Sequence, residues 1–302
     1  MKKGRSLFVV GAFIMSFSTV FGQSDYAFKV LANKGTNEVK SGDAWIAIKT
    51  GAVLKEHDEL KLSENSYVGL VSAKGKPLEL KSSGSYKVID LLTKVQTGST
   101  VLNKYTDFIL SSNSAEAKKN RLSATGSVTR GDEKALKVYL PENNNADVFN
   151  NFAIINWEKA NGPYVVTLKN MFDDELAVIE TPETTAQIDL ASKEYVNESA
   201  ILVEVKSKGD GKIKSKQYLL KKLSPTHAEK VKKDLIADFG TDVMEETPLS
   251  KFLLAAFYEQ HKLFIDAITA YEQAIKMAPD VPSYKEAYEE FLLRNKMKTT
   301  NP

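Results

Sequence analysis

Two stretches of helix-period apolar residues lie within residues 247–279, separated by a short polar break at 259–262. Small residues recur in both stretches at positions where two paired helices would have to approach closely. Thr247 and Pro248 supply an N-cap residue and a first-turn proline, which favour a helix start. The segment therefore predicts a helical hairpin, and no other segment of the chain restricts the fold as strongly.

The period of the apolar pattern changes at Ser224, from alternation typical of strands to a repeat typical of helices. Ser224 and Pro225 repeat the start signal seen at 247–248. Pro282 opens a last amphipathic stretch. We therefore expect four helices, over about 226–239, 248–260, 263–277 and 283–296.

Short apolar stretches alternate with turn clusters in two earlier regions, residues 26–92 and 135–223. Strands of four to eight residues bounded by turn signals are typical of all-β modules. In the second region seven strands are expected, at 135–140, 152–157, 164–169, 176–180, 186–190, 200–206 and 212–220. The segment 111–134 has few large apolar residues, so a linker is expected there.

The first 22 residues read as a secretory signal peptide. Lys2, Lys3 and Arg5 form a basic head, residues 7–21 are apolar, and Gly22 offers a small residue at the cleavage position. The apolar run is short for a bilayer span, which needs about 20 residues, although an uncleaved anchor remains the alternative. We expect export to the periplasm or the outside and no stable membrane insertion after cleavage.

Charge and cysteine content narrow the classes of partner. The formal net charge is +2, and the basic head contributes three positive charges, so the rest of the chain is close to −1. A near-neutral chain offers no electrostatic case for binding nucleic acid. The chain has no cysteine, which excludes a thiol nucleophile, a lipidated cysteine and a cysteine-ligated metal.

The first β-region resembles the FecR-type domain, a non-enzymatic extracytoplasmic β-module. The matching residues are Trp45, Ile48, Gly51, Leu54, Asp58, Leu60, Leu62, Ser66, Val68, Leu70, Gly75, Leu78 and Leu80. The resemblance covers about 38–92 and implies a module of the kind used in transmembrane signalling and in many envelope proteins. Trp45 is expected in the core, because a tryptophan is more often a core residue than part of a ligand platform. The family's signalling form has a cytoplasmic segment before one membrane span, whereas here the expected signal peptide leads straight into the β-module, so the sensor role is not carried over. Residues 21–23 resemble signal-peptide ends of Bacteroidetes proteins.

The run from Trp157 to Val166 resembles the opening of an Ig-like or fibronectin type III-like sandwich, which implies a Trp packed between two sheets. The helical hairpin at about 248–281 resembles a tetratricopeptide repeat. The residues that match the repeat, and that we expect to pack its helices or contact a partner, are Leu254, Ala255, Tyr258, Ala267, Tyr271, Ala274 and Pro279. Lys251 departs from the family's bulky apolar residue. Thr269 is expected on the outer face.

Candidate chemistry is sparse. His57, His227 and His261 lie in three different segments without metal-ligand spacing. The acidic triplet 173–175 lacks the alternating ligands of a calcium loop, so turn chemistry is the better interpretation. We therefore expect no catalytic residue, no metal and no cofactor.

The sequence predicts a multidomain β-plus-α protein, with two all-β modules followed by a C-terminal helical module. The expected divisions are 1–22 (signal peptide), 23–110 (FecR-like module), 111–134 (linker), 135–223 (Ig-like sandwich) and 224–302 (tetratricopeptide-like module). The expected function is non-catalytic binding or scaffolding of another envelope protein. An envelope carbohydrate hydrolase and an extracytoplasmic ligand sensor are the alternatives.

Overall fold

The computed structural model describes residues 26–95, 101–124, 135–141, 145–240 and 246–298. In these ranges the chain is mixed β and α, and its β sheets precede a C-terminal run of helices. The predicted signal peptide, 1–22, lies outside the described residues. None of the described helices has the length and apolar character that crossing a bilayer requires.

The first β-module has two four-stranded sheets, in the orders β4-β1-β6-β7 and β3-β2-β5-β8. Apolar residues from both sheets form one buried cluster, and α1 (Val88–Thr93) closes it with Val88 and Leu91. The strands are β1 (Phe28–Lys34), β2 (Glu38–Ser41), β3 (Ala44–Ala47), β4 (Val53–Leu54), β5 (Glu59–Leu62), β6 (Tyr67–Ser72), β7 (Pro77–Leu80) and β8 (Gly84–Lys87).

The second β-module pairs a five-stranded sheet, β12-β11-β14-β15-β9, with a two-stranded sheet, β10-β13. Its strands are β9 (Asn145–Val148), β10 (Phe152–Asn156), β11 (Tyr164–Lys169), β12 (Glu175–Thr181), β13 (Thr185–Asp189), β14 (Ala200–Ser207) and β15 (Tyr218–Lys222). Trp157 is buried as expected, and its ring meets Tyr164 edge-on at 5.4 Å.

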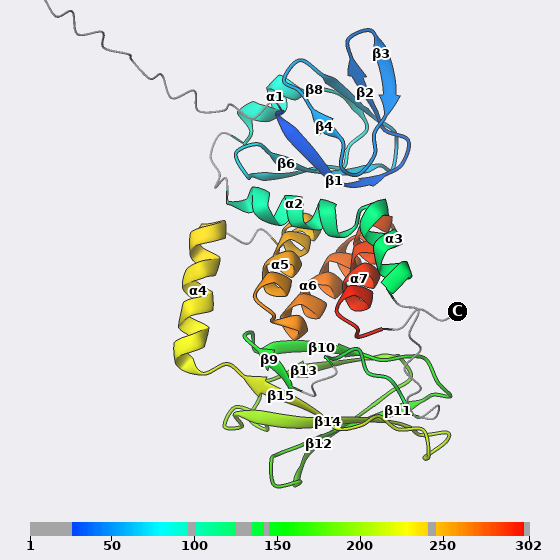
Figure 1. The fold of residues 1–302 in the computed structure, drawn as a ribbon, viewed down its shortest axis with the longest axis vertical. Coiled ribbons are helices and arrows are strands. Elements are labelled where there is room, and N and C mark those ends of the chain that lie inside the picture. Colours follow the sequence, from blue (N-terminus) through cyan, green and yellow to red (C-terminus); the bar gives the residue numbers. More distant parts are fainter. Residues whose placement is uncertain (1–25, 96–100, 125–134, 142–144, 241–245, 299–302) are drawn as a thin grey trace, which may run out of the picture.

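Helices from two distant parts of the chain form a layer between the β-modules (Figure 1). The early helices are α2 (Leu102–Ser112) and α3 (Ala115–Ala124). The late ones are α4 (Pro225–Phe239), α5 (Pro248–Gln260), α6 (Phe264–Met277) and α7 (Pro282–Arg294). The four late helices agree with the predicted ranges to within two residues.

The helical layer explains why β6 is buried at all six positions. Its residues alternate between the first module's own core and the outer face of the sheet, where Tyr67 and Val71 belong to the same buried cluster as the helices. Gly69 lies at this joint, and a Cβ there would come within 3.2 Å of Leu249 Cδ1. A glycine in β6 therefore lets α5 approach the sheet closely.

Three expectations about secondary structure are wrong. Residues 111–124 are not a linker, because α2 continues to Ser112 and α3 begins at Ala115, where the Ser114 hydroxyl accepts a hydrogen bond from Ala117 N at 3.2 Å. The expected strand 135–140 reduces to a single bridge between Val138 and Trp157. The expected strand 212–220 begins only at Tyr218. Residues 125–134 of the expected linker lie outside the described residues.

Candidate functional site

The hairpin residues singled out in the sequence form the interior of the helical layer. Leu254, Ala255 and Tyr258 on α5, with Ala267, Tyr271 and Ala274 on α6, are all buried. Pro279 is exposed and follows the end of α6. Side chains buried in this way pack the protein's own core, so these six residues offer no surface to another protein.

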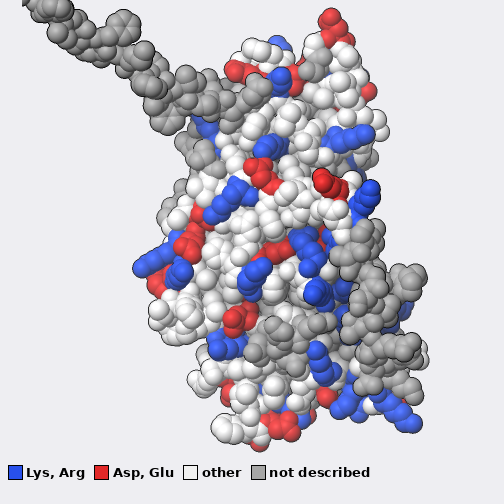
Figure 2. Space-filling view, in the orientation of Figure 1, with Lys and Arg blue, Asp and Glu red and all other residues white. Residues whose placement is uncertain are grey.

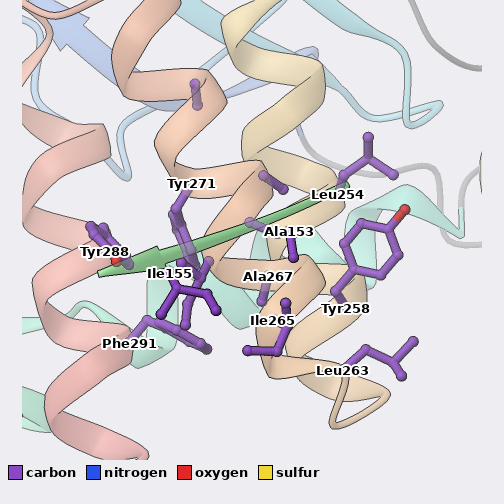
Figure 3. Packing of buried hydrophobic residues seen from close by; sticks show 14 of the residues in the cluster. Ala153, Ile155, Leu254, Tyr258, Leu263, Ile265, Ala267, Tyr271, Tyr288 and Phe291 are labelled. Carbon is purple, nitrogen blue, oxygen red and sulfur yellow. The ribbon is translucent and has the colours of Figure 1, made fainter. Parts of the chain in front are cut away.

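The second β-module covers the face of α6 that was expected to point outward. Figure 3 shows β10, with Ala153 and Ile155, crossing close to Ile265, Ala267 and Tyr271 of α6. Strand β10 pairs with β13 along one edge. The helical hairpin is thus already engaged, and the β-strand that occupies it belongs to the same chain.

Three polar side chains on α6 serve as hydrogen-bond acceptors for this strand and for the residues just before it. Asp266, Thr269 and Glu272 recur every three residues and so lie on one side of the helix. The Thr269 hydroxyl accepts from Ile154 N at 3.0 Å, and Asn156 Nδ2 donates to Glu272 Oε1 at 2.5 Å. Thr269 is therefore buried, and the expectation that it lies on the outer face is wrong. Strand β10 has donor groups that are not used in pairing with β13. These groups need acceptors, and the polar side chains of α6 provide them in the interior of the protein.

Asp266 makes the densest of these contacts. Its Oδ2 accepts from Phe149 N at 2.9 Å, and its Oδ1 accepts from the backbone and side-chain nitrogens of Asn150 at 2.8 Å each. The side chain is fully buried, and burial raises the pKa of its carboxyl to about 6 in spite of these donors, which favour the charged form. The folded protein therefore binds this proton more readily than the unfolded chain does.

The raised pKa of Asp266 predicts a stability that depends on pH. The stabilising contribution from protonation is fully present below the ordinary value of 3.8 and is lost as the pH rises through about 6. Acidification from pH 7.5 to pH 5 is therefore expected to raise the free energy of unfolding through Asp266 by about 1 kcal/mol, out of the roughly 3 kcal/mol that is reached below pH 3.8. Burial also raises the pKa of Glu272, which acts in the same direction.

Burial lowers the pKa of His261, which opposes the effect of Asp266 because stability from a neutral histidine is lost on acidification. The measurement is therefore a difference: urea unfolding of the wild type and of Asp266→Asn, followed between pH 5 and pH 7.5. Asp266→Asn should remove the Asp266 component of the slope and leave the others. Parallel curves for the two proteins would show that Asp266 does not titrate in this range.

A different set of contacts joins the helices to the first β-module. The hydroxyls of Tyr67 on β6 and Tyr284 on α7 are 2.7 Å apart in the buried joint, and burial raises the pKa of both. Leu249 N, in the first turn of α5, donates to Glu79 Oε1 at 2.8 Å. The helical layer is therefore bonded to a β-module on each side.

Arg294 connects the helices with one another. Its guanidinium donates to both carboxylate oxygens of Glu259, through Nε at 2.6 Å and through the second terminal nitrogen at 2.5 Å. It also lies 5.7 Å from the ring centre of Phe108 on α2 and 5.8 Å from that of Phe291 on α7. One side chain thus joins α2, α5 and α7. This role could not be predicted from the sequence, in which Arg294 is only a basic residue at the end of a helix.

Strand β3, which reads Ala-Trp-Ile-Ala, has apolar side chains that are exposed. Trp45 is 40% exposed and Ile46 is 56% exposed, so the expectation that Trp45 lies in the core is wrong. Within the described ranges β3 pairs only with β2 and forms the edge of its sheet. Figure 1 shows the β2–β3 hairpin projecting from the end of the molecule opposite the second β-module.

Both faces of β3 carry an apolar side chain. Ile46 is opposite Val39, which in turn is opposite the core residue Leu60, so Ile46 continues the core face beyond the core. Trp45 lies on the other face, where the ammonium of Lys61 is 5.8 Å from the centre of its ring. Proteins usually protect an edge strand with charges, proline or a cover, and β3 contains neither a charge nor a proline.

The histidines and the acidic triplet take structural positions. His57 and His227 are exposed, whereas His261 packs its ring 4.2 Å from that of Phe257. In the acidic turn, the Asn170 side chain accepts from Phe172 N and Asp174 N, which is turn chemistry as expected. No group of three or more His, Cys, Asp or Glu within the described residues is placed to hold a metal ion.

Basic and acidic residues are interspersed on the face drawn in Figure 2. No protein-family model matches the chain, and none of the curated proteins compared with it matches. The family resemblances of the two β-modules and of the helical hairpin therefore rest on the residues quoted for them.

Proposed function

We propose that the chain is a non-catalytic binding or scaffold protein of the bacterial cell envelope, exported by residues 1–22, which acts by contacting another envelope protein. The modules that its segments resemble, FecR-type, Ig-like and tetratricopeptide-like, serve binding rather than catalysis. The contact surface differs from the one that the sequence suggests, because the hairpin already holds its own β-strand.

The observation that carries the proposal is the free, uncharged edge of β3 with Trp45 and Ile46 exposed on its two faces. An extended segment of a partner could add to such an edge as a further strand. Main-chain hydrogen bonds would supply affinity, and burial of the two apolar side chains would add to it. The hairpin and the second β-module would then hold the first module rigidly in place.

The direction of the backbone groups on β3 gives a specific way to test strand addition. In an antiparallel ladder successive N–H groups point alternately toward the paired strand and away from it. Ile48 N donates to Asn37 O at 2.8 Å, so the preceding N–H, that of Ala47, points to the free edge. Ala47→Pro removes this donor without removing a hydrogen bond between β2 and β3.

The experiment places a photocrosslinking amino acid at Ile46 in the full chain and irradiates intact producing cells. A crosslink to a second protein is expected at this position and not at Lys193, a side chain that is 92% exposed on the second β-module. Ala47→Pro should abolish the crosslink while thermal unfolding stays unchanged. Equal crosslinking at the two positions, or full crosslinking in Ala47→Pro, would rule out strand addition at β3.

A further inference from the structure

A cavity of about 370 Å³ lies where the first β-module meets the helical layer. Its walls come from β1, the turn at 50–51, the α2–α3 junction, α5 and α7. Small-molecule sites commonly occupy about 300–1,000 Å³ and occur preferentially between modules. The size and position of the cavity are therefore those of a ligand site.

The inner wall of the cavity is apolar. Leu31 on β1, Ile109 on α2, Phe252 on α5 and Ala287 on α7 line it, and all four are buried in the core. These side chains already pack against the surrounding elements, so the wall has a fixed shape. The half-buried Leu110 and the exposed Ala115 line the cavity above this wall, and an aliphatic or aromatic group bound there would remove their side chains from water.

The polar part of the cavity carries one charge of each sign. Lys118 of α3 and Glu286 of α7 both line it, together with the hydroxyls of Thr50 and Ser283, which are 3.3 Å apart. Within the described residues neither Lys118 nor Glu286 takes part in an ion pair, and they do not pair with each other. One basic and one acidic residue thus line the same cavity without an ion pair between them.

We propose that this cavity binds a small zwitterion with an apolar side chain, of the class of a free amino acid or a short peptide. The ligand's carboxylate would pair with Lys118, its ammonium with Glu286, and its side chain would lie on the apolar wall. A simple anion would be repelled by Glu286 and a simple cation by Lys118. A zwitterion gains from both residues, since hydrogen bonds between charged groups are the stronger ones.

The site is separate from the free edge of β3 and does not depend on the proposed function. A ligand there would contact both the first β-module and the helices, so its binding would stabilise the joint between them. That property would suit the ligand-sensor alternative, since the position of the β-module would respond to a small molecule.

The first part of the test compares three probes of nearly equal shape: L-leucine, 4-methylpentanoate, which lacks the ammonium, and isopentylamine, which lacks the carboxylate. Each is titrated to millimolar concentration into the isotope-labelled mature chain, and backbone amide shifts are followed by NMR. L-leucine is expected to shift the amide signals of residues in the cavity wall. The other two probes are expected to bind at least about tenfold more weakly than L-leucine. Leucyl-leucine, run in parallel, distinguishes a peptide from an amino acid as the tighter ligand.

The second part uses variants of the half-buried Lys118 and the exposed Glu286, neither of which belongs to the buried core. Lys118→Met and Glu286→Gln should each weaken binding of the tighter zwitterion about tenfold. The matched controls Glu116→Gln on α3 and Lys285→Met on α7 are exposed and do not line the cavity, so they should bind as the wild type does. Ala115→Trp, at the exposed rim, should block entry.

Any of three results would overturn the proposal. The first is that neither L-leucine nor leucyl-leucine shifts the amides of the cavity wall. The second is that the acid or the amine binds as tightly as the zwitterions do. The third is that Lys118→Met and Glu286→Gln behave like their controls.

Discussion

Removing residues 224–302 is expected to abolish the cooperative unfolding of both β-modules. The sequence predicts the opposite, since the change of period at Ser224 suggests a detachable helical module. In the structure, however, Tyr67 and Val71 of the first module and Ala153 and Ile155 of the second belong to one buried cluster with the helices. A chain that ends at 223 would expose all of these apolar faces to water.

The truncated chain, residues 23–223, is compared with residues 23–302 by thermal unfolding, and the binding of an apolar dye measures how much of the core is exposed. We expect no cooperative transition and strong dye binding. The matched control keeps every residue but introduces one protease site within 125–134. Its two fragments should stay associated and unfold as the intact protein does, because packing rather than chain continuity holds the layers together. A sharp unfolding transition in the truncated chain would instead support the prediction that the helical module is detachable.

Local patterns in the sequence predict the elements whose stability is local. The hairpin α5–α6 shows both its start signal and its apolar period, and its predicted bounds agree with the structure to within one residue. Helix α2 carried a similar signal in Leu102, Tyr105, Thr106 and Ile109, all buried on one side. This helical signal is not recognised from the sequence, because the segment follows a series of strand patterns and is assigned to the end of a β-module.

Helix α3 shows a different limit of sequence patterns. It has almost no apolar side, so its composition resembles a linker. Ala, Glu, Lys and Arg are nevertheless strong helix formers, and Ser114 caps the first turn. Arg121 on this helix pairs with Glu290 of α7, 169 residues away in the chain. A contact between residues so far apart in the chain produces no local pattern in the sequence.

The residues that join the layers could not be identified for the same reason. Asp266, Thr269 and Glu272 are polar and helical, which in an isolated helix indicates a solvated face. Their partners are the backbone and side chains of 149–156, more than 110 residues earlier, and only the fold brings that strand to the helix. Trp45 was misplaced for the converse reason, because an aromatic residue in a strand is usually buried but here lies on an edge.

Glu259→Ala is expected to lower the free energy of unfolding by about 3–5 kcal/mol, because it leaves the guanidinium of Arg294 buried without its partner. Glu259 is only 4% exposed and holds Arg294 through two hydrogen bonds, and Asn295 Nδ2 donates to Glu259 Oε1 at 2.9 Å. Urea unfolding of residues 23–302 measures the loss. The matched control is Glu289→Ala, whose pair with Lys298 is half exposed and should matter by about 1 kcal/mol or less.

A second variant distinguishes the cost of leaving a charge unpaired from the cost of losing side-chain packing. In the double variant Glu259→Leu with Arg294→Met, both charges are replaced by apolar side chains, and replacement of a buried pair in this way is often close to neutral. Much of the stability lost in Glu259→Ala should therefore return. If the double variant is as unstable as Glu259→Ala, the loss comes from packing around Phe108 and Phe291. If Glu259→Ala matches the Glu289→Ala control, the pair does not hold the helices together.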